Sequence, residues 1–163
     1  MASNIKPTFK EIPSAREMSF GIVVSEWNQP VTDSLFKASY DTLIENGAVA
    51  ENIHVKYVPG SFELTLGAQF FAEYTDVDAV ICLGCIIQGA TPHFTYICQS
   101  VTHGLTELNM QYNMPFIFGV LTTNTYEEAL ERAGGKLGNK GADAAITAIK
   151  MVALHMQMEE ESD

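Results

Sequence analysis

The chain has 163 residues, 47% of them hydrophobic, and a formal net charge of −11 from 9 basic and 20 acidic residues. This length suits one globular domain with a sizeable core, and the negative charge argues against a nucleic-acid partner. No apolar run approaches the ~18 residues of a membrane span, and the polar N-terminus lacks the apolar centre of a signal peptide. We therefore expect a cytoplasmic protein.

Apolar strand-like and helix-period segments alternate along the chain. In chain order we predict an N-terminal arm (1–18, interrupted by Pro7 and Pro13), a strand (20–25), a helix (32–46), a strand (53–58), a helix (61–74), a strand (79–83), a helix from Phe94, a strand (116–121), a short helix after Thr125, a last helix to residue 157 and a frayed acidic tail (158–163). The last helix should bury Ala142, Ala145, Ile146, Ile149, Val152, Ala153 and Met156.

Turn and cap residues separate these elements. We expect Gly47 to end the first helix, Ser61 to cap the second and Thr91 to cap the third. Thr125 and Glu128 have the spacing of a capping box for the short helix.

The repeated strand–helix order predicts one α/β domain over residues 19–157, a parallel sheet with helices on both faces. Ligands of such sheets bind in the loops beyond the carboxyl ends of the strands. The four loops that follow the predicted strands are residues 25–30, 58–63, 86–93 and 121–125.

The third of these loops favours an anion site. Gly89 lets a ligand approach the backbone, and the helix after Thr91 and Pro92 offers free N–H groups at the positive end of its dipole. No Lys or Arg occurs from Tyr57 to Glu131, so any cation must come from elsewhere. An ordinary capped helix is the alternative interpretation.

His93 falls in the first turn of that helix, where the dipole disfavours the imidazolium. A neutral imidazole beside a phosphate can act as a general base. A solvent-facing or capping histidine is the alternative. The remaining histidines lack this placement, and we interpret them as structural: His54, His103 and His155.

Two other loops carry unusual side chains. Trp27, the only tryptophan, can stack on a flat heterocycle with Asn28 bonding a polyol or amide, or it packs against its own loop. Glu63 offers a carboxylate or simply complements a helix dipole. A basic segment that contains Arg132 and Lys140 is interrupted by several glycines. It either reaches an anion that is bound elsewhere or lies in solvent on the surface.

Three cysteines, Cys82, Cys85 and Cys98, lack the second CxxC or CxxH pair that would complete a zinc site. We interpret them as reduced, mostly buried thiols, and we expect no metal ion.

Five motifs, in this order, resemble those of the lumazine synthase family: WN at 27–28, PGSFE at 59–63, GCIIQGATPH at 84–93, FGVLTT at 118–123 and ERAGGKLGNKGADAA at 131–145. The resemblance covers roughly residues 18–155. It implies a flavodoxin-like, three-layer α/β sandwich with a four-stranded parallel sheet. It also implies the condensation of 5-amino-6-(D-ribitylamino)uracil with 3,4-dihydroxy-2-butanone 4-phosphate to 6,7-dimethyl-8-ribityllumazine, phosphate and water, without a cofactor.

The resemblance implies a role for each motif residue. His93 would transfer protons, and Arg132 of an adjacent subunit would pair with the phosphate. The substrate-binding residues would be Trp27, Asn28, Gly60, Ser61, Phe62, Glu63, Cys85, Ile86, Ile87, Phe118 and Lys140. The phosphate-binding residues would be Gln88, Gly89, Ala90 and Thr91, with Arg132.

Three positions depart from the pattern of many family members. Gln88 replaces a basic residue, which should weaken phosphate attraction somewhat. Ser61 stands where many members have Ala. Trp27 replaces Phe and enlarges the stacking surface, from which we hypothesise that riboflavin also binds.

The resemblance also implies partners. Subunits would form pentamers, twelve of which form a 60-subunit icosahedral shell in many members, and riboflavin synthase is a further suggested partner. The alternatives are a non-catalytic flavin- or lumazine-binding protein, a shell-forming protein on the same scaffold, and a flavodoxin-type electron carrier, for which the loop after the first strand is a poor match.

Overall fold

A computed structural model describes residues 11–163 of the chain. Most of the predicted arm, including Pro7, lies outside the described residues. Its last part packs on the body of the domain: Ala15 is fully buried, and its N–H donates to the carbonyl oxygen of Asn46 at 2.8 Å.

The centre of the fold is a four-stranded sheet with the order β2-β1-β3-β4. Its strands are β1 (Phe20–Ser25), β2 (Ile53–Val58), β3 (Ala79–Ile87) and β4 (Phe116–Thr123). All neighbours in this sheet pair in parallel, as predicted. The central strand β1 is buried at every residue, which explains its unbroken apolar run, because a parallel sheet is covered on both faces.

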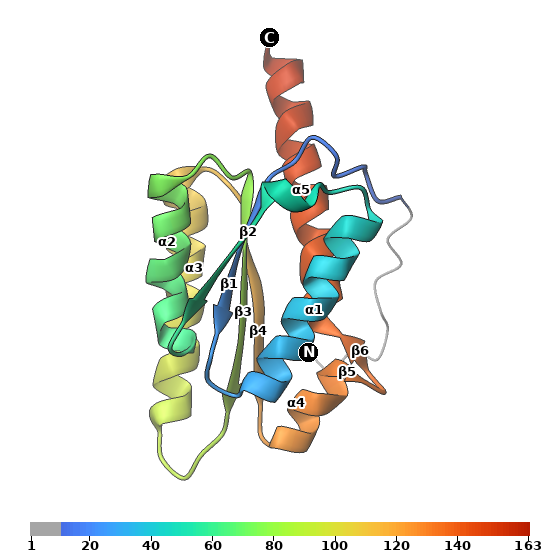
Figure 1. Ribbon diagram of the computed structural model, residues 1–163. Coiled ribbons are helices and arrows are strands. Elements are labelled where there is room, and N and C mark those ends of the chain that lie inside the picture. The colour runs from blue at the N-terminus through green and yellow to red at the C-terminus, as the bar shows by residue number, and fades with distance from the viewer. Residues whose placement is uncertain (1–10) are drawn as a thin grey trace.

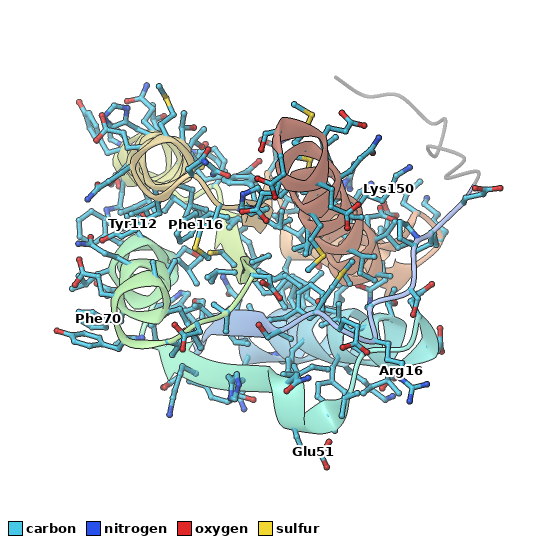
Figure 2. All side chains as sticks on the ribbon, turned by 90° about the horizontal axis from the view of Figure 1, so that it is seen from above. Arg16, Glu51, Phe70, Tyr112, Phe116 and Lys150 are labelled. Atoms are coloured by element: carbon cyan, nitrogen blue, oxygen red, sulfur yellow. The ribbon has the colours of Figure 1, made fainter. Side chains whose placement is uncertain are left out.

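The helices form a layer on each face of the sheet (Figures 1 and 2). Helices α2 and α3 cover one face, and α1, α4 and α5 cover the other. The helices are α1 (Gln29–Glu45), α2 (Leu64–Tyr74), α3 (His93–Tyr112), α4 (Tyr126–Arg132) and α5 (Lys140–Ser162), with the short 3₁₀ turns η1 (Ala50–Asn52) and η2 (Ser61–Glu63) and the strand pair β5 (Ala133–Gly135) and β6 (Gly138–Asn139). This arrangement confirms the predicted α/β sandwich.

Each face of the sheet has its own apolar core, because successive strand residues point to opposite faces. On β1, Ile22 packs toward α1 and α5, whereas Val23 packs toward α2 and α3. Leu35 and Phe71 extend these two cores from their helices. Fully burying a side chain of this size contributes roughly 1.5–3 kcal/mol, so both layers hold the sheet firmly.

Helices α1 and α5 pack closely at Gly141. A Cβ atom there would lie 2.0 Å from the carbonyl oxygen of Leu35, so only glycine fits without moving a helix backbone. The start of α5, with Lys140, is thereby fixed against the body of the domain.

Several predicted boundaries are confirmed. Gly47 follows the end of α1 with a φ of 100°, a conformation that favours glycine. The N–H of Glu128 donates to the Thr125 hydroxyl at 3.1 Å, so Thr125 caps α4. The Glu128 carboxylate in turn accepts from the N–H of Asn124 at 2.8 Å.

Other predicted boundaries are wrong. Helix α3 has Pro92 as its N-cap without a side-chain cap hydrogen bond, so Thr91 does not cap it. Ser61 does not cap α2, because the 3₁₀ turn η2 intervenes. Strands β3 and β4 and helix α1 extend beyond their predicted ranges.

The last helix also runs further than predicted. It continues to Ser162, where we expected a frayed tail. Of its predicted face, Ala145, Ile149 and Val152 are buried and the others are partly exposed. Among residues 11–163, no helix has the length and apolar content needed to cross a membrane.

Candidate active site

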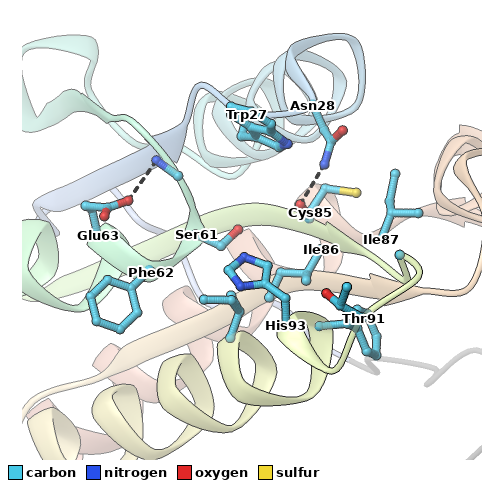
Figure 3. A pocket seen from close by; sticks show the side chains of 14 residues that line it. Trp27, Asn28, Ser61, Phe62, Glu63, Cys85, Ile86, Ile87, Thr91 and His93 are labelled. Atoms are coloured by element: carbon cyan, nitrogen blue, oxygen red, sulfur yellow. Dashed lines mark hydrogen bonds between the residues drawn. The ribbon is translucent and has the colours of Figure 1, made fainter.

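A cleft of about 560 Å³ opens where strands β1 and β3 end (Figure 3). The chain passes from β1 outward to β2 and then to β3 on the other side of β1, and this switch point is where open α/β sheets bind ligands. The residues that line the cleft are Trp27, Asn28, Gly60, Ser61, Phe62, Glu63, Cys85, Ile86, Ile87, Gly89, Thr91, His93, Phe94 and Ile97. Most predicted substrate-binding residues are thus brought together.

Trp27 and Asn28 form one wall of the cleft. The Trp27 side chain is 73% exposed, so the alternative of a tryptophan packed against its own loop is wrong. Asn28 adopts a left-handed conformation with a φ of 62°, and its Nδ2 donates to the carbonyl oxygen of Cys85 at 2.9 Å. Asn28 therefore ties the loop after β1 to the end of β3.

The PGSFE segment forms a compact turn beside this wall. The N–H of Gly60 donates to Glu63 Oε2 at 3.0 Å, and the N–H of Glu63 donates to the carbonyl oxygen of Gly60 at 3.1 Å. The Glu63 carboxylate thus holds its own turn while it remains exposed to the cleft. Phe62 is 56% exposed, whereas Ser61 is buried.

The predicted anion loop lies at the end of β3. The N–H of Gln88 donates to the carbonyl oxygen of Thr123 at 2.9 Å, and its Nε2 donates to the carbonyl oxygen of Gly89 at 2.9 Å. A Cβ atom on Gly89 would meet nothing within 4 Å, so the backbone is open there. Gly89 and Thr91 line the cleft, whereas Gln88 and Ala90 do not.

His93 is exposed at the first position of α3. Figure 3 shows its imidazole directed across the cleft toward Ser61. From this position the ring can exchange a proton with a ligand in the cleft.

Phe94 and Ile97 also line the cleft. Both also pack against the apolar core on the face of the sheet that α2 and α3 cover. Their position in the first turn after the anion loop was the signal that they also face a ligand.

Cys85 lines the cleft but lacks the properties of a nucleophile. Burial raises the pKa of the Cys85 thiol to about 11 and that of Cys82 to about 12, so both thiols are protonated at neutral pH, whereas the thiolate is the reactive form. Between residues 11 and 163, no group of three or more His, Cys, Asp or Glu side chains is placed to hold a metal ion.

A second hollow, of about 580 Å³, lies along the outer edge of β4. It contains three predicted site residues that the first cleft lacks: Phe118, Arg132 and Lys140. Arg132 Nη1 donates to the carbonyl oxygen of Glu128 at 2.9 Å, and Lys140 Nζ lies 3.1 Å from Asp143 Oδ2. Strand β4 is at the edge of the sheet, and Phe118 is 44% exposed on it.

The sequence matches known proteins over most of its length. A family model described as 6,7-dimethyl-8-ribityllumazine synthase matches residues 17–156. A relative of that name from Parabacteroides distasonis is 56% identical over 144 residues, 88% of this chain and 90% of the relative. Relatives of the same name from Bacteroides fragilis (57% over 135 residues; 83% and 94%) and Porphyromonas gingivalis (53% over 146 residues; 90% and 91%) are similar to the same extent.

Proposed function

This chain belongs to the 6,7-dimethyl-8-ribityllumazine synthase family, and we propose that its cleft and its β4 hollow are two halves of one active site shared by neighbouring subunits. The protein is a transferase of riboflavin biosynthesis. It condenses 5-amino-6-(D-ribitylamino)uracil with 3,4-dihydroxy-2-butanone 4-phosphate, and the products are 6,7-dimethyl-8-ribityllumazine, phosphate and water.

The reaction needs little catalytic machinery. The amine adds to the ketone and water leaves as the imine forms, phosphate then leaves by β-elimination, and the ring closes with loss of further water. Each step requires close approach of the two substrates and a group that moves protons. His93 is the residue of the cleft that is placed to move them.

The pyrimidine substrate binds in the part of the cleft near β1. The exposed Trp27 ring stacks on the flat pyrimidine, and the turn of Ser61, Phe62 and Glu63 holds the ribityl chain. The backbone of Ile86 and Ile87, which line the cleft, hydrogen-bonds to the edge of the ring.

The phosphate substrate binds at the start of α3. Backbone N–H groups of Gly89, Ala90 and Thr91 and the helix dipole attract the phosphate. None of the residues that line the cleft is Lys or Arg. We assign the charge to Arg132, with Lys140 nearby, because both line the hollow on the β4 edge. This division is the observation that carries the proposal.

A site of this kind suits a ring of subunits, in which each subunit gives its β4 edge to one neighbour and its cleft to another. We expect a pentamer, and a 60-subunit shell and an association with riboflavin synthase remain predictions from the family resemblance. A cytoplasmic location likewise remains a prediction from the sequence.

The decisive experiment combines two inactive variants in one oligomer. His93→Ala and Arg132→Ala are each expected to lower lumazine formation at least about tenfold. When the two are co-expressed with different tags and purified through both, about one site in four should hold an intact His93 and an intact Arg132 from different subunits. Absorbance of the lumazine then reports recovered turnover, after the rate without enzyme is subtracted.

The double variant, His93→Ala with Arg132→Ala, co-expressed with itself is the control and should stay inactive. If the mixed oligomers remain as inactive as this control, each site is built from one chain and the shared site is wrong. If the wild type forms no lumazine, the non-catalytic binding protein replaces the enzyme.

A further inference from the structure

Helix α4, which ends in Arg132, is too short to be stable on its own. It has seven residues, Tyr126–Arg132, whereas isolated helices shorter than about 12–15 residues are marginal in water. Its first turn therefore depends on groups that accept hydrogen bonds from the free N–H groups at its start. Because the helix is so short, whatever fixes its first turn also fixes the position of Arg132.

Glu128 connects the start of α4 to Arg132 through three separate groups. Its N–H donates to Thr125 Oγ1 at 3.1 Å. Its carboxylate Oε2 accepts from the N–H of Asn124 at 2.8 Å. Its carbonyl oxygen accepts from Arg132 Nη1 at 2.9 Å. A shift of Glu128 would therefore move the guanidinium of Arg132 as well.

The turn that Glu128 binds is itself attached to the sheet. Thr123 is the last residue of β4 and is 5% exposed. Its hydroxyl donates to the carbonyl oxygen of Thr125 at 2.8 Å, and its carbonyl oxygen accepts from the N–H of Gln88 at 2.9 Å. Glu128 thus passes the fixed position of the strand end on to Arg132.

The bond to Glu128 occupies only one nitrogen of Arg132. Within residues 11–163, no hydrogen bond or ion pair engages its Nη2 and Nε atoms. A guanidinium is a planar fork of N–H donors, and two adjacent nitrogens of such a fork can bind a phosphate together. One edge of the Arg132 side chain is thus held, and the other is free for an anion.

We propose that Glu128 is a positioning residue, which aims this free edge of Arg132 at the phosphate substrate in the cleft of the neighbouring subunit. The inference rests on the proposed function, which gives Arg132 its place in that site. Glu128 acts through Arg132 and not on the substrate. It orders α4 and the guanidinium before the substrate binds, so binding has less conformational freedom to remove.

The test compares Glu128→Ala with Glu127→Ala. The control removes the same charge from the same turn, but the Glu127 carboxylate has no partner among the described residues. Glu128→Ala should raise KM for the phosphate substrate about fivefold, whereas Glu127→Ala should stay within about twofold of the wild type. Glu128→Gln should restore most of the loss, because its amide oxygen still accepts from Asn124. KM for the pyrimidine substrate should stay unchanged in all three variants.

A double-mutant cycle shows whether Glu128 acts through Arg132. In a chain that already carries Arg132→Ala, Glu128→Ala should cause no further rise of KM for the phosphate substrate. The same rise with and without Arg132 would overturn the inference, because it indicates a general distortion. Glu128→Gln as impaired as Glu128→Ala would also overturn it. If melting curves show that Glu128→Ala does not fold, Thr125→Ala replaces it, with Thr125→Ser as the conservative variant.

The proposed function and this inference fail in different ways. If Arg132→Ala alone keeps the kinetics of the wild type, the shared site is refuted, and the inference falls with it. If Arg132→Ala loses activity while Glu128→Ala keeps the kinetics of the wild type, only the inference is refuted.

Discussion

The cleft and the β4 hollow differ in chemical equipment. The cleft has a flat aromatic ring, an exposed histidine and open backbone at Gly89, but its lining contains neither Lys nor Arg. The hollow on the β4 edge has Arg132 and Lys140 beside the exposed Phe118, but no histidine lines it. Neither alone suits a reaction between a neutral heterocycle and a phosphorylated ketone.

This difference shows how a strongly acidic chain can bind an anion. Within the domain, the cations are held away from the cleft: Arg132 by the carbonyl oxygen of Glu128 and Lys140 by Asp143. Pairing across an interface would bring them to the phosphate, so that binding depends on assembly. Variants that change either the cleft or the β4 hollow alone can therefore separate the two contributions.

The largest effect is expected at the β4 hollow. Arg132→Ala should lower kcat/KM for the phosphate substrate about 30-fold, because a hydrogen bond to a charged group contributes roughly 2 kcal/mol. Lys136→Ala is the matched control, since Lys136 is paired with Glu131 at 3.0 Å and does not line the hollow. Initial rates of lumazine formation measure both, and equal losses in the two variants would refute a specific role of Arg132.

A smaller effect is expected at the aromatic wall of the cleft. Trp27→Ala should raise KM for the pyrimidine substrate about fivefold, because stacking contributes ~1 kcal/mol, whereas Trp27→Phe should stay close to wild type. Trp27 is the only tryptophan, so its fluorescence also reports riboflavin. Absence of quenching at micromolar riboflavin would remove the hypothesis that riboflavin binds there.

The smallest effect is expected at Cys85. Cys85→Ser should change turnover less than about twofold, because burial raises the pKa of the thiol from 9.0 to about 11 and leaves no thiolate at neutral pH. A larger loss of turnover would indicate that Cys85 acts as a nucleophile in the cleft.

Because the Cys85 thiol is buried, we expect the stability of the folded protein to depend on pH. The pKa of the Cys85 thiol is higher in the folded protein than in the unfolded chain. The folded state therefore keeps its full stability below pH 9.0 and loses stability as the pH rises toward about 11. The melting temperature of the wild type should therefore fall more steeply than that of Cys85→Ser between about pH 8 and about pH 10.5. Parallel curves would contradict this prediction.

The sequence predicted the sheet well because its strands are buried on both faces and read as short apolar runs. It failed at the helix starts. Pro92 itself is the N-cap of α3, which begins at His93, so Thr91 lies one position too far back to cap the helix. Ser61 contacts Gly84 from a distant part of the chain, and no local pattern reveals such a contact.

The candidate site was predictable only in part for a similar reason. The motifs identified most residues of the cleft, since they lie in loops after strands. That Arg132 and Phe118 line a different hollow follows from the position of β4 at the sheet edge, which depends on the three-dimensional strand order. Phe94 and Ile97 were missed because one side chain can serve both the core and the cleft.

The long C-terminal helix has a practical use. Its 23 residues extend over about 35 Å. It begins at Lys140, which lines the β4 hollow, and its C-terminal end lies at the opposite end of the sheet from the loop between β3 and α3 (Figure 1). A fluorophore or affinity peptide attached after Asp163 would therefore be displayed away from the chemistry. The C-terminus is thus the natural attachment point for labels that distinguish two kinds of subunit in one particle.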